Sequence, residues 1–418
     1  MKTSLRFALV DANHFYCSCE RVFAPGLEGR PVVVLSNNDG CIVSVTQEAK
    51  DLGITRGVPI FQIRPLIQRH RVAVFSSNYT LYGDFSRRVM DTLKHFTPRV
   101  EVYSIDEAFV DLTDHQDLAA YGCQMRSTVK QWTGIPVSIG IAQTKTLAKI
   151  ANRLAKRSEL GVLDLTTCDQ EQVLASIAIE DVWGIGPRWS KRLRQQGIVS
   201  ALALRQANKA WIKQQMGVIG VRIVWELEGY SCLPLELNPK PKKSVVVSRS
   251  FGIPVESLKE LQEAVATFTA RAAYKLRREH LAAQYLTVFV STSRFKKPYY
   301  SNQKTTSLPV ATNHTQELIG YALALTERLY RKGLPFAKAG VLMMKLVSDN
   351  QMQINLFDTC DREGAARLLQ AMDEINEQMG RGTLRYGAEG LKQGWQTRAG
   401  QRSPRWTTQW AELPIVKA

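Results

Sequence analysis

A run of alternating apolar residues that surrounds two adjacent carboxylates, Asp106 and Glu107, constrains the fold of this chain most. Residues 100–112 alternate at a period of two, which predicts two short strands joined near residues 104–107. Neighbours on a straight strand point to opposite faces, so both carboxylates can serve one site only if the backbone bends there. Taken alone, such a pair is more often part of a solvated turn, and it needs a partner elsewhere.

A third carboxylate, Asp11, ends the apolar run 7–10, which is typical of a buried strand. As an alternative, Asp11 could cap the next segment, although no clear capping box follows it. Three carboxylates from two sheet segments suit a hard, oxygen-seeking cation such as Mg²⁺. Placed together, they would hold two ions about 3.5–4 Å apart, the arrangement used for nucleotidyl transfer.

The charge of the chain points to a polyanionic partner. It has 55 Lys and Arg against 38 Asp and Glu, a net charge of +17 over 418 residues. It lacks a run of some 20 apolar residues and the apolar core of a signal peptide, which favours a soluble nucleic-acid-binding protein over a membrane protein. The seven cysteines have no zinc-site spacing and are typical of a reducing cytoplasm.

Three segments, 11–16, 103–109 and 140–149, stand in the order and rough spacing of motifs in the Y-family translesion DNA polymerases, which the chain resembles nearly end to end. The segment 36–41 and the carboxyl-terminal tail resemble the UmuC-type branch, the catalytic subunits of bacterial DNA polymerase V. The resemblance implies an error-prone, template-directed DNA polymerase. We expect it to act in the cytoplasm, associated with the nucleoid, during the SOS response to DNA damage.

The predicted element order strand, helix, two strands, helix, strand is ferredoxin-like, which fits a polymerase palm. The resemblance implies an α+β multidomain protein with a small fingers unit, a helix-hairpin-helix thumb, an α/β little finger and a loop-rich tail. The expected parts are a palm (1–24 and 84–173), fingers (25–83), thumb (174–238), little finger (239–348) and a clamp- and partner-binding tail (349–418).

In that family the three carboxylates, Asp11, Asp106 and Glu107, are the catalytic metal ligands, and two Mg²⁺ ions are the implied cofactor. Tyr16 falls at the steric gate, whose ring fills the space of a ribose 2′-hydroxyl; its alternative role is that of a core aromatic. The remaining residues at nucleotide-binding positions are Phe15, Ser44, Lys50 and Lys156.

Two departures affect the triphosphate contacts, because Gln47 and Lys50 stand where many members have tyrosine and arginine. A helix predicted over residues 145–157 has an apolar face that can dock on the sheet and a basic face that includes Lys156. That basic face would contact a phosphate chain, or would simply be solvated.

Cations are concentrated in residues 240–348, where eighteen Lys and Arg stand against six Glu. The resemblance places a DNA-backbone grip there and in a glycine hairpin followed by a basic helix near residues 183–195. Any one of these side chains could instead be merely solvated. The predicted DNA-binding residues are Gly184, Gly186, Lys191, Arg249, Arg294, Lys296 and Lys297.

The tail has nine acidic and nine basic residues from 349 onwards. Gln353, Leu356 and Phe357 belong to a short peptide that resembles the sliding-clamp motif of bacterial polymerases, although a match of five residues arises easily by chance. The family's other partners are primer-template DNA, deoxynucleoside triphosphates, a processed UmuD-type homodimer and a recombinase filament.

Two rival functions remain open at this point. A non-catalytic DNA-bound scaffold that recruits clamp and repair partners would explain the basic second half and the tail, but not the carboxylate set with Tyr16. A nucleotide cyclase built on a similar palm would leave the basic thumb and little finger without a role.

Overall fold

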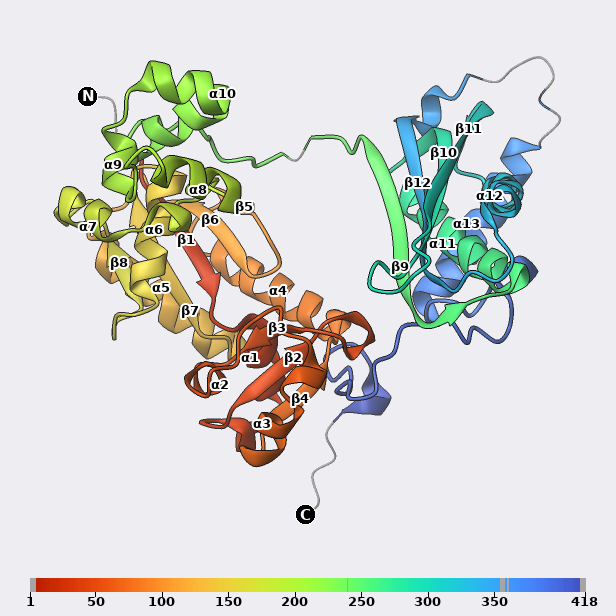
Figure 1. Cartoon of the computed structure of the whole chain (residues 1–418), viewed down its shortest axis with the longest axis horizontal. Helices are drawn as coiled ribbons and strands as arrows, with labels where there is room; N and C mark the ends of the chain where they lie inside the picture. Colours follow the sequence, from red (N-terminus) through yellow and green to blue (C-terminus); the bar gives the residue numbers. More distant parts are fainter. Residues whose placement is uncertain (1–4, 239, 354–357, 359–360, 414–418) are drawn as a thin grey trace. The chain divides into compact units, whose positions relative to one another are not determined.

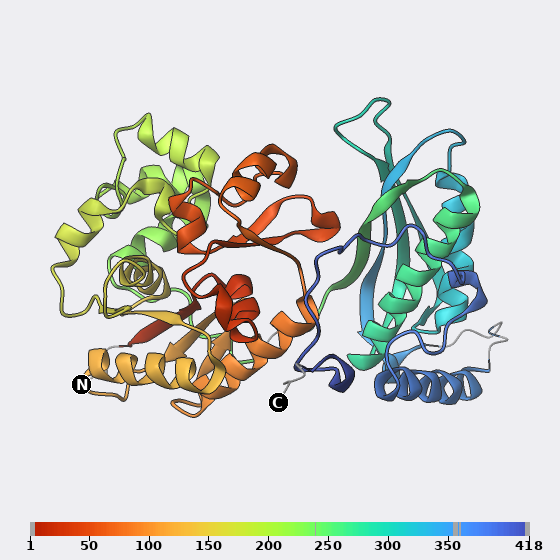
Figure 2. The ribbon, with the colours of Figure 1, turned by 90° about the horizontal axis from the view of Figure 1, so that it is seen from below.

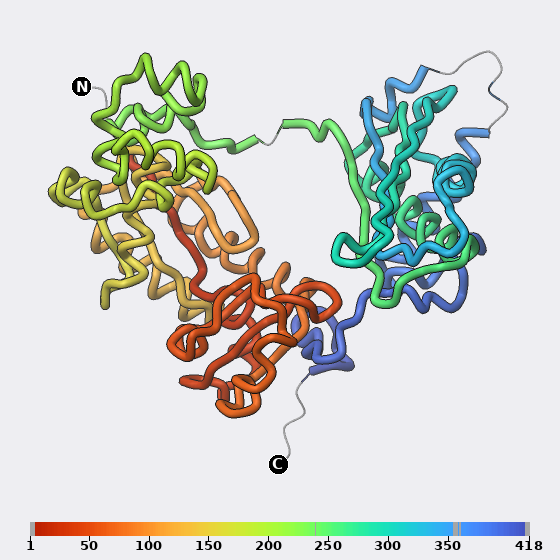
Figure 3. The backbone as a smooth tube through the Cα atoms, in the orientation of Figure 1, coloured from red at the N-terminus to blue at the C-terminus, as the bar shows by residue number. Residues whose placement is uncertain are grey.

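The computed structural model describes residues 5–238, 240–353, 358 and 361–413 (Figures 1 and 3). Backbone contacts divide the chain into two compact units. The first consists of Met1–Ser36, Gly40–Pro239 and Gln401–Ala418, and the second of Asn37–Asp39 and Lys240–Gly400. The predicted α+β multidomain class is confirmed, because both units combine a sheet with packed helices. The five-part division stays a prediction.

The first unit is built on a five-stranded sheet with the order β5-β6-β1-β7-β8. Its central strand, β1, pairs antiparallel with both β6 and β7, and β7 pairs parallel with β8. The predicted hairpin of residues 100–112 is confirmed as β5 and β6. The strand bounds are Val100–Val102 (β5), Glu107–Asp111 (β6), Phe7–Ala12 (β1), Val137–Ala142 (β7) and Val162–Asp164 (β8).

Helices cover both faces of this sheet (Figure 2). On one face, Ala8 and Val10 pack in a core with α1 (Phe15–Val22), α4 (Tyr79–Lys94) and α5 (Leu118–Thr133). On the other, Leu9 and Phe109 pack against α6 (Lys145–Ala155). Because side chains alternate along a strand, Asp11 lies on the same face of the sheet as Leu9, and Glu107 lies on the same face as Phe109. Both carboxylates therefore belong to the face that α6 covers.

A small three-stranded sheet, with the order β3-β2-β4, follows α1 in the chain. The valines of β2 alternate, so that Val32 and Val34 join the core of the larger sheet while Val33 and Leu35 join a separate small core. The element bounds are Val32–Leu35 (β2), Ile42–Val45 (β3), Gln47–Asp51 (α2), Arg64–Arg69 (α3) and Ala73–Ser76 (β4).

Four short to medium helices complete the first unit and share a core with α6 and the sheet. The glycine hairpin predicted before a basic helix is present: Gly184 has a φ of 91°, and α8 begins at Pro187. The helix bounds are Gln170–Ser176 (α7), Pro187–Arg194 (α8), Ala201–Arg205 (α9) and Lys209–Leu227 (α10).

The second unit has an antiparallel sheet with the order β11-β10-β12-β9, and α11 and α12 pack on it. The combination of sheet and helices agrees with the α/β class that the resemblance implied for residues 239–348, and the first half of β11 is rich in exposed polar residues. The bounds are Ser244–Val255 (β9), Leu258–Arg278 (α11), Leu281–Thr292 (β10), Ser301–Thr312 (β11), Thr315–Leu329 (α12) and Phe336–Ser348 (β12).

The carboxyl-terminal segment contains a helix, α13 (Arg362–Gln378), that the glycine-rich composition of the tail did not indicate. Asp373 of α13 pairs with Arg277 of α11 at 2.7 Å, and Trp395 is buried in the second unit's core. The residues from Gln401 onwards belong to the first unit. No helix among the described residues is long and apolar enough to cross a membrane.

Candidate active site

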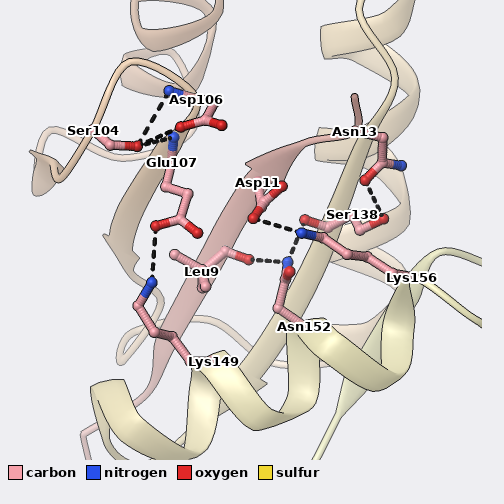
Figure 4. A network of polar contacts seen from close by, with 10 residues as sticks. All are labelled: Leu9, Asp11, Asn13, Ser104, Asp106, Glu107, Ser138, Lys149, Asn152 and Lys156. Atoms are coloured by element: carbon pink, nitrogen blue, oxygen red, sulfur yellow. Dashed lines mark hydrogen bonds and ion pairs between the residues drawn. The ribbon is translucent and has the colours of Figure 1, made fainter. Parts of the chain in front are cut away.

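Asp11 and Glu107 lie side by side on the adjacent strands β1 and β6 of the five-stranded sheet (Figure 4). They are register partners in the β1-β6 ladder and lie on the face covered by α6. Asp11 is 7% exposed. The sequence therefore correctly linked these two segments, and the ladder brings their carboxylates together.

Asp106 immediately precedes β6, and the backbone bends at this residue. Such a bend is what Asp106 and Glu107 would need in order to serve one site. Its carbonyl oxygen accepts a hydrogen bond from the backbone N–H of Ala12 at 2.8 Å, which ties the bend to the end of β1. The hydroxyl of Ser104 donates to Asp106 Oδ1 at 2.6 Å and accepts from the backbone N–H groups of Asp106 and Glu107. Ser104 thus shapes the bend and holds the Asp106 side chain.

Two lysines of the α6 region neutralise the facing carboxylates. Lys149 Nζ lies 2.8 Å from Glu107 Oε2, and Lys156 Nζ lies 2.7 Å from Asp11 Oδ2 (Figure 4). Their spacing of seven residues is two helical turns, so both project from the same side of the helix. Two side chains of the predicted basic face, Lys149 and Lys156, are therefore turned toward the carboxylates.

The two facing carboxyl groups differ in proton affinity. Burial raises the pKa of Asp11, which the Lys156 ammonium only partly offsets, and the proximity of Glu107 raises it further. Burial alone would also raise the pKa of Glu107, but hydrogen bonds from Lys149 and from Asp11 bring it below its usual value. The pair therefore holds a proton more readily on Asp11.

The donor types at this site fit a hard divalent cation. Asp11, Asp106 and Glu107 offer only carboxylate oxygens, which Mg²⁺ prefers. Among the described residues, no group of three or more His, Cys, Asp or Glu side chains is close enough to hold a metal, and Ser104 and the two lysines bond the three carboxylates individually. A bound cation would replace these contacts.

Tyr16 lies beside the carboxylates as part of an aromatic cluster. Its ring stacks on Tyr82 of α4, with centroids 4.4 Å apart and planes 13° apart, and meets the edge of Tyr79 at 6.1 Å. Burial raises the pKa of Tyr16, and Asp106 is among the charges that raise it further. The ring is partly buried and packs against the core of the larger sheet, so its role at the steric gate stays a prediction.

A group of cations surrounds the start of α1. Partial burial lowers the pKa of Lys50, and the neighbouring Arg56 and Lys156 add to the effect. Burial and the same cations, Lys50 and Arg56, lower the pKa of His14 to about 4, so its imidazole is neutral at pH 7. This concentration of positive charge is suited to a polyphosphate.

Two of the residues predicted to bind nucleotide are buried. Phe15 is 3% exposed and belongs to the core of the larger sheet. Ser44 is 3% exposed, and its hydroxyl accepts from the backbone N–H of Cys17 at 3.4 Å and donates to the carbonyl of His14 at 3.3 Å. Their contacts support the start of α1, so the predicted nucleotide-binding side chains that are open to a ligand are the partly exposed Tyr16 and the exposed Lys50 and Lys156.

Sequence reasoning missed Arg56 and the residues that anchor α6. Arg56 lies between Gly53 and Gly57, and a basic residue in a glycine-bounded loop was an available signal. Asn152 of α6 donates to the carbonyls of Leu9 and Ser138 at 3.1 and 2.7 Å (Figure 4).

The position of α6 also depends on a glycine in β7. A Cβ added at Gly140 would lie 1.9 Å from the backbone nitrogen of Asn152, so only glycine allows this close approach. The backbone contact therefore sets how near the α6 lysines come to the carboxylates.

The predicted DNA-binding residues are distributed over both units. Gly184 and Gly186 flank the turn before α8, which carries Lys191. The loop between β10 and β11 presents three exposed cations, Arg294, Lys296 and Lys297. Arg249 of β9 is exposed and lies near Arg271 and Lys275 of α11, whose pKa values it helps to lower. Of the clamp peptide, Leu356 and Phe357 lie outside the described residues, and Gln353 is exposed.

Family models match three parts of the chain. Residues 10–153 match the impB/mucB/samB family, and residues 242–356 match the C-terminal domain of that family. Residues 366–416 match a domain of unknown function, DUF4113.

Curated relatives and solved structures align over most of the chain. Protein UmuC of Salmonella typhimurium is 45% identical over 98% of this chain and 100% of its own length. Protein MucB of Escherichia coli is 41% identical over 98% of this chain and 99% of its own. A solved Y-family DNA polymerase chimera, Dbh-Dpo4-Dbh, has a TM-score of 0.65 at 21% identity, and the match covers 82% of this chain and 99% of the chimera.

Proposed function

The chain belongs to the impB/mucB/samB family, and from that premise we propose that it is an error-prone, template-directed DNA polymerase that extends primers past damaged bases. The reaction would be nucleotidyl transfer from a deoxynucleoside triphosphate to the primer 3′-hydroxyl. One observation carries the proposal: the facing pair Asp11 and Glu107, with Asp106 at the adjoining bend, lies beside both an aromatic gate and a cluster of cations.

The carboxylates would hold divalent cations, with two Mg²⁺ ions as our proposal. Such ions, held by Asp11, Asp106 and Glu107, would neutralise charge on the transferring phosphate and would lower the pKa of the attacking hydroxyl. In the absence of a cation, Lys156 and Lys149 supply the compensating charge for Asp11 and Glu107. Lys156 is the more exposed of the two, with 41% of its side chain accessible against 17%, and is the one free to turn to the triphosphate.

The cations around α1 would bind the phosphates of the incoming nucleotide. Lys50 and Arg56 are exposed on the small three-stranded unit, and both act electrostatically on His14 at the start of α1. A neutral His14 adds no charge of its own, which leaves phosphate neutralisation to Lys50, Arg56 and Lys156. Each charge-assisted contact of this kind contributes about 1.5–3 kcal/mol.

Tyr16 would select the sugar of the nucleotide. Its ring stacks on Tyr82 and contacts the edge of Tyr79. Moving the ring to make room for a 2′-hydroxyl would break these ring contacts. Selection of the base would be weak, because base-pair hydrogen bonding discriminates only modestly where little protein surrounds the nascent pair. We propose translesion synthesis for this reason.

The remaining predicted binding residues would contact DNA and partner proteins. The α8 turn, the loop between β10 and β11, and Arg249 would contact the backbone of the duplex without reading bases. We further propose that the enzyme works in the cytoplasm with a processed UmuD-type dimer, a recombinase filament and a sliding clamp held through residues 353–357.

Primer extension across an abasic template tests the proposal. Wild type is compared with Asp106→Ala and Glu107→Ala in Mg²⁺, with and without the processed UmuD-type dimer and activated recombinase. We expect wild type to extend the primer and both substitutions to abolish extension while duplex DNA binding remains. Folded, DNA-bound wild type that adds no nucleotide in any of these mixtures would instead favour the scaffold function.

A further inference from the structure

Near the carboxyl-terminal end of the chain, residues 401–406 belong to the first unit and contact α1 and α4, the two helices around Tyr16. Tyr16 lies on α1, and the two tyrosines around it, Tyr79 and Tyr82, lie in the first turn of α4. The segment lies within the part of the chain that matches DUF4113, for which the family model gives no function.

At the start of α4, the segment binds the capping residue itself. Asn78 is 1% exposed, and its side-chain oxygen accepts from the backbone N–H of Leu81, which caps the helix. Its side-chain nitrogen donates to the carbonyls of Ser403 and Pro404 at 3.0 and 3.1 Å and to the hydroxyl of Ser403 at 3.0 Å. One amide therefore joins the helix that carries Tyr79 and Tyr82 to the tail.

The backbone just before α4 is bound as well. Ser76, the last residue of β4, donates its N–H to the carbonyl of Gln401 at 3.0 Å, and its hydroxyl accepts from the N–H of Gln401 at 2.9 Å. The segment thus adds to the edge of the small sheet through main-chain contacts that do not depend on its side chains.

At the end of α1, the contact is aromatic. Trp406 packs on Phe23, the residue that ends α1, with ring centroids 4.7 Å apart. Trp406 is also packed against the core that contains α1, α4 and the sheet. Such a pair contributes about 0.5–1.5 kcal/mol beyond the burial of its area.

A buried carboxyl group connects these contacts to the gate. Tyr82, which stacks on Tyr16, donates its hydroxyl to Glu20 Oε1 at 2.6 Å, and Glu20 lies one helical turn beyond Tyr16 on α1. Glu20 and Tyr82 are both 0% exposed. Burial raises the pKa of this carboxyl group, and the hydroxyls of Tyr82 and Ser403 only partly offset the rise.

From these contacts we propose that residues 401–406 are a positioning element for sugar selection: they fix α1 against α4 and so hold the Tyr16 ring in the place where it excludes a 2′-hydroxyl. The inference rests on the proposed function of Tyr16. A gate of this kind depends on the position of a single ring, and a displacement of about 1 Å is enough to change the rate for a poorly fitting substrate by up to roughly a hundredfold. A deoxynucleotide leaves room at that ring and is affected less.

Single-nucleotide insertion kinetics test the inference. The full chain is assayed in complex with the processed UmuD-type dimer, and kcat and KM are measured separately for a deoxynucleotide and for the corresponding ribonucleotide. Asn78→Asp keeps the helix cap but removes the amide donors. Trp406→Ala removes the ring from Phe23, and Trp406→Phe keeps an aromatic contact. Trp410→Ala is the matched control, since Trp410 follows the segment and is 88% exposed.

We expect the ratio of ribonucleotide to deoxynucleotide kcat/KM to rise roughly tenfold in Asn78→Asp and Trp406→Ala, by less in Trp406→Phe, and not at all in Trp410→Ala. Tyr16→Ala should raise the ratio further. An unchanged ratio in Tyr16→Ala would overturn the gate assignment and this inference with it. A rise in Tyr16→Ala that is absent from both Asn78→Asp and Trp406→Ala would overturn this inference alone.

Hydrogen-deuterium exchange gives a readout that does not need activity. Trp406→Ala should speed exchange in peptides covering α1 and the first turn of α4, while α5, which the segment does not contact through any described hydrogen bond, should keep its protection. Unchanged protection of α1 and α4 would contradict the inference, whatever the insertion kinetics.

Discussion

Lys156 donates from the end of α6 to Asp11 in the centre of the sheet, with Nζ 2.7 Å from Oδ2. The lysine side chain is 41% exposed while that of Asp11 is 10% exposed, so the contact joins a solvent-accessible cation to a nearly buried anion. The same lysine acts electrostatically on Lys50 and on His14 at the start of α1. Lys156 therefore lies within reach of both the carboxylates and the expected position of the triphosphate.

Replacing Lys156 should weaken use of the incoming nucleotide. Because a charge-assisted contact contributes about 1.5–3 kcal/mol, we expect Lys156→Met to lower kcat/KM for nucleotide insertion roughly 10–100-fold, and Lys156→Arg to recover part of the loss. Steady-state insertion kinetics measure this. Lys130→Met, at an exposed lysine of α5 on the other face of the sheet, is the control. Equal kcat/KM for Lys156→Met and wild type would remove Lys156 from the site.

Removing the Ser104 hydroxyl should loosen the bend that carries Asp106. That hydroxyl makes one side-chain and two backbone hydrogen bonds there, so Ser104→Ala frees both Asp106 and the start of β6. We expect kcat to fall about tenfold with DNA affinity unchanged, and Ser104→Thr to retain most of the activity. Ser127→Ala, at an exposed serine of α5, controls for the loss of a hydroxyl. A fall in DNA affinity without any change in kcat would contradict this role.

The buried carboxyl of Glu20 should make stability depend on pH. Burial raises its pKa from 4.5 to about 7, so the folded chain binds this proton more tightly than the unfolded chain. Its contribution to stability is then fully present below about pH 4.5 and is lost as pH rises to about 7, by about 3 kcal/mol at most.

Glu20→Gln removes that titration and should be more stable than wild type at pH 8 but not at pH 5. Thermal unfolding midpoints of both proteins at the two pH values measure the effect. Glu28→Gln, at an exposed position after α1, should show no such change. The same difference between Glu20→Gln and wild type at pH 5 and pH 8 would show that Glu20 does not titrate in this range.

A methyl group added at Gly186 should affect DNA binding and leave the fold intact. No atom lies within 4 Å of a Cβ built there, and the φ of −82° is open to any residue. Stability should change by less than about 0.5 kcal/mol. If phosphates approach the backbone at this turn, Gly186→Ala should weaken duplex binding about three- to tenfold, as measured by fluorescence anisotropy at two salt concentrations. Gly26→Ala is the control, because its Cβ also meets nothing; equal DNA affinity of the two variants would exclude such contact.

Local patterns were sufficient to predict much of the scaffold. The alternation in residues 100–112 predicted the hairpin of β5 and β6, and the helix predicted over residues 145–157 is α6, which ends two residues earlier. Polar strands such as β11 carry no such signal, since an edge strand with few buried side chains does not alternate. The helix α13 was missed for a related reason: glycines and tryptophans farther along the tail dominated its composition.

The sequence by itself determined the strand parity that puts Asp11 on the face of Leu9 and Glu107 on the face of Phe109, whereas the pairing of β1 with β6 that brings the two carboxylates together is a tertiary contact. Only the tertiary structure decided what surrounds them. The pairing of Lys149 and Lys156 depends on how closely α6 approaches Gly140, and the Tyr16 stack depends on the crossing of α1 and α4. The return of residues 401–406 to Asn78 spans more than 320 positions. Periodicity reports the local backbone and its buried face, whereas contacts between distant segments are set by packing that no short window contains.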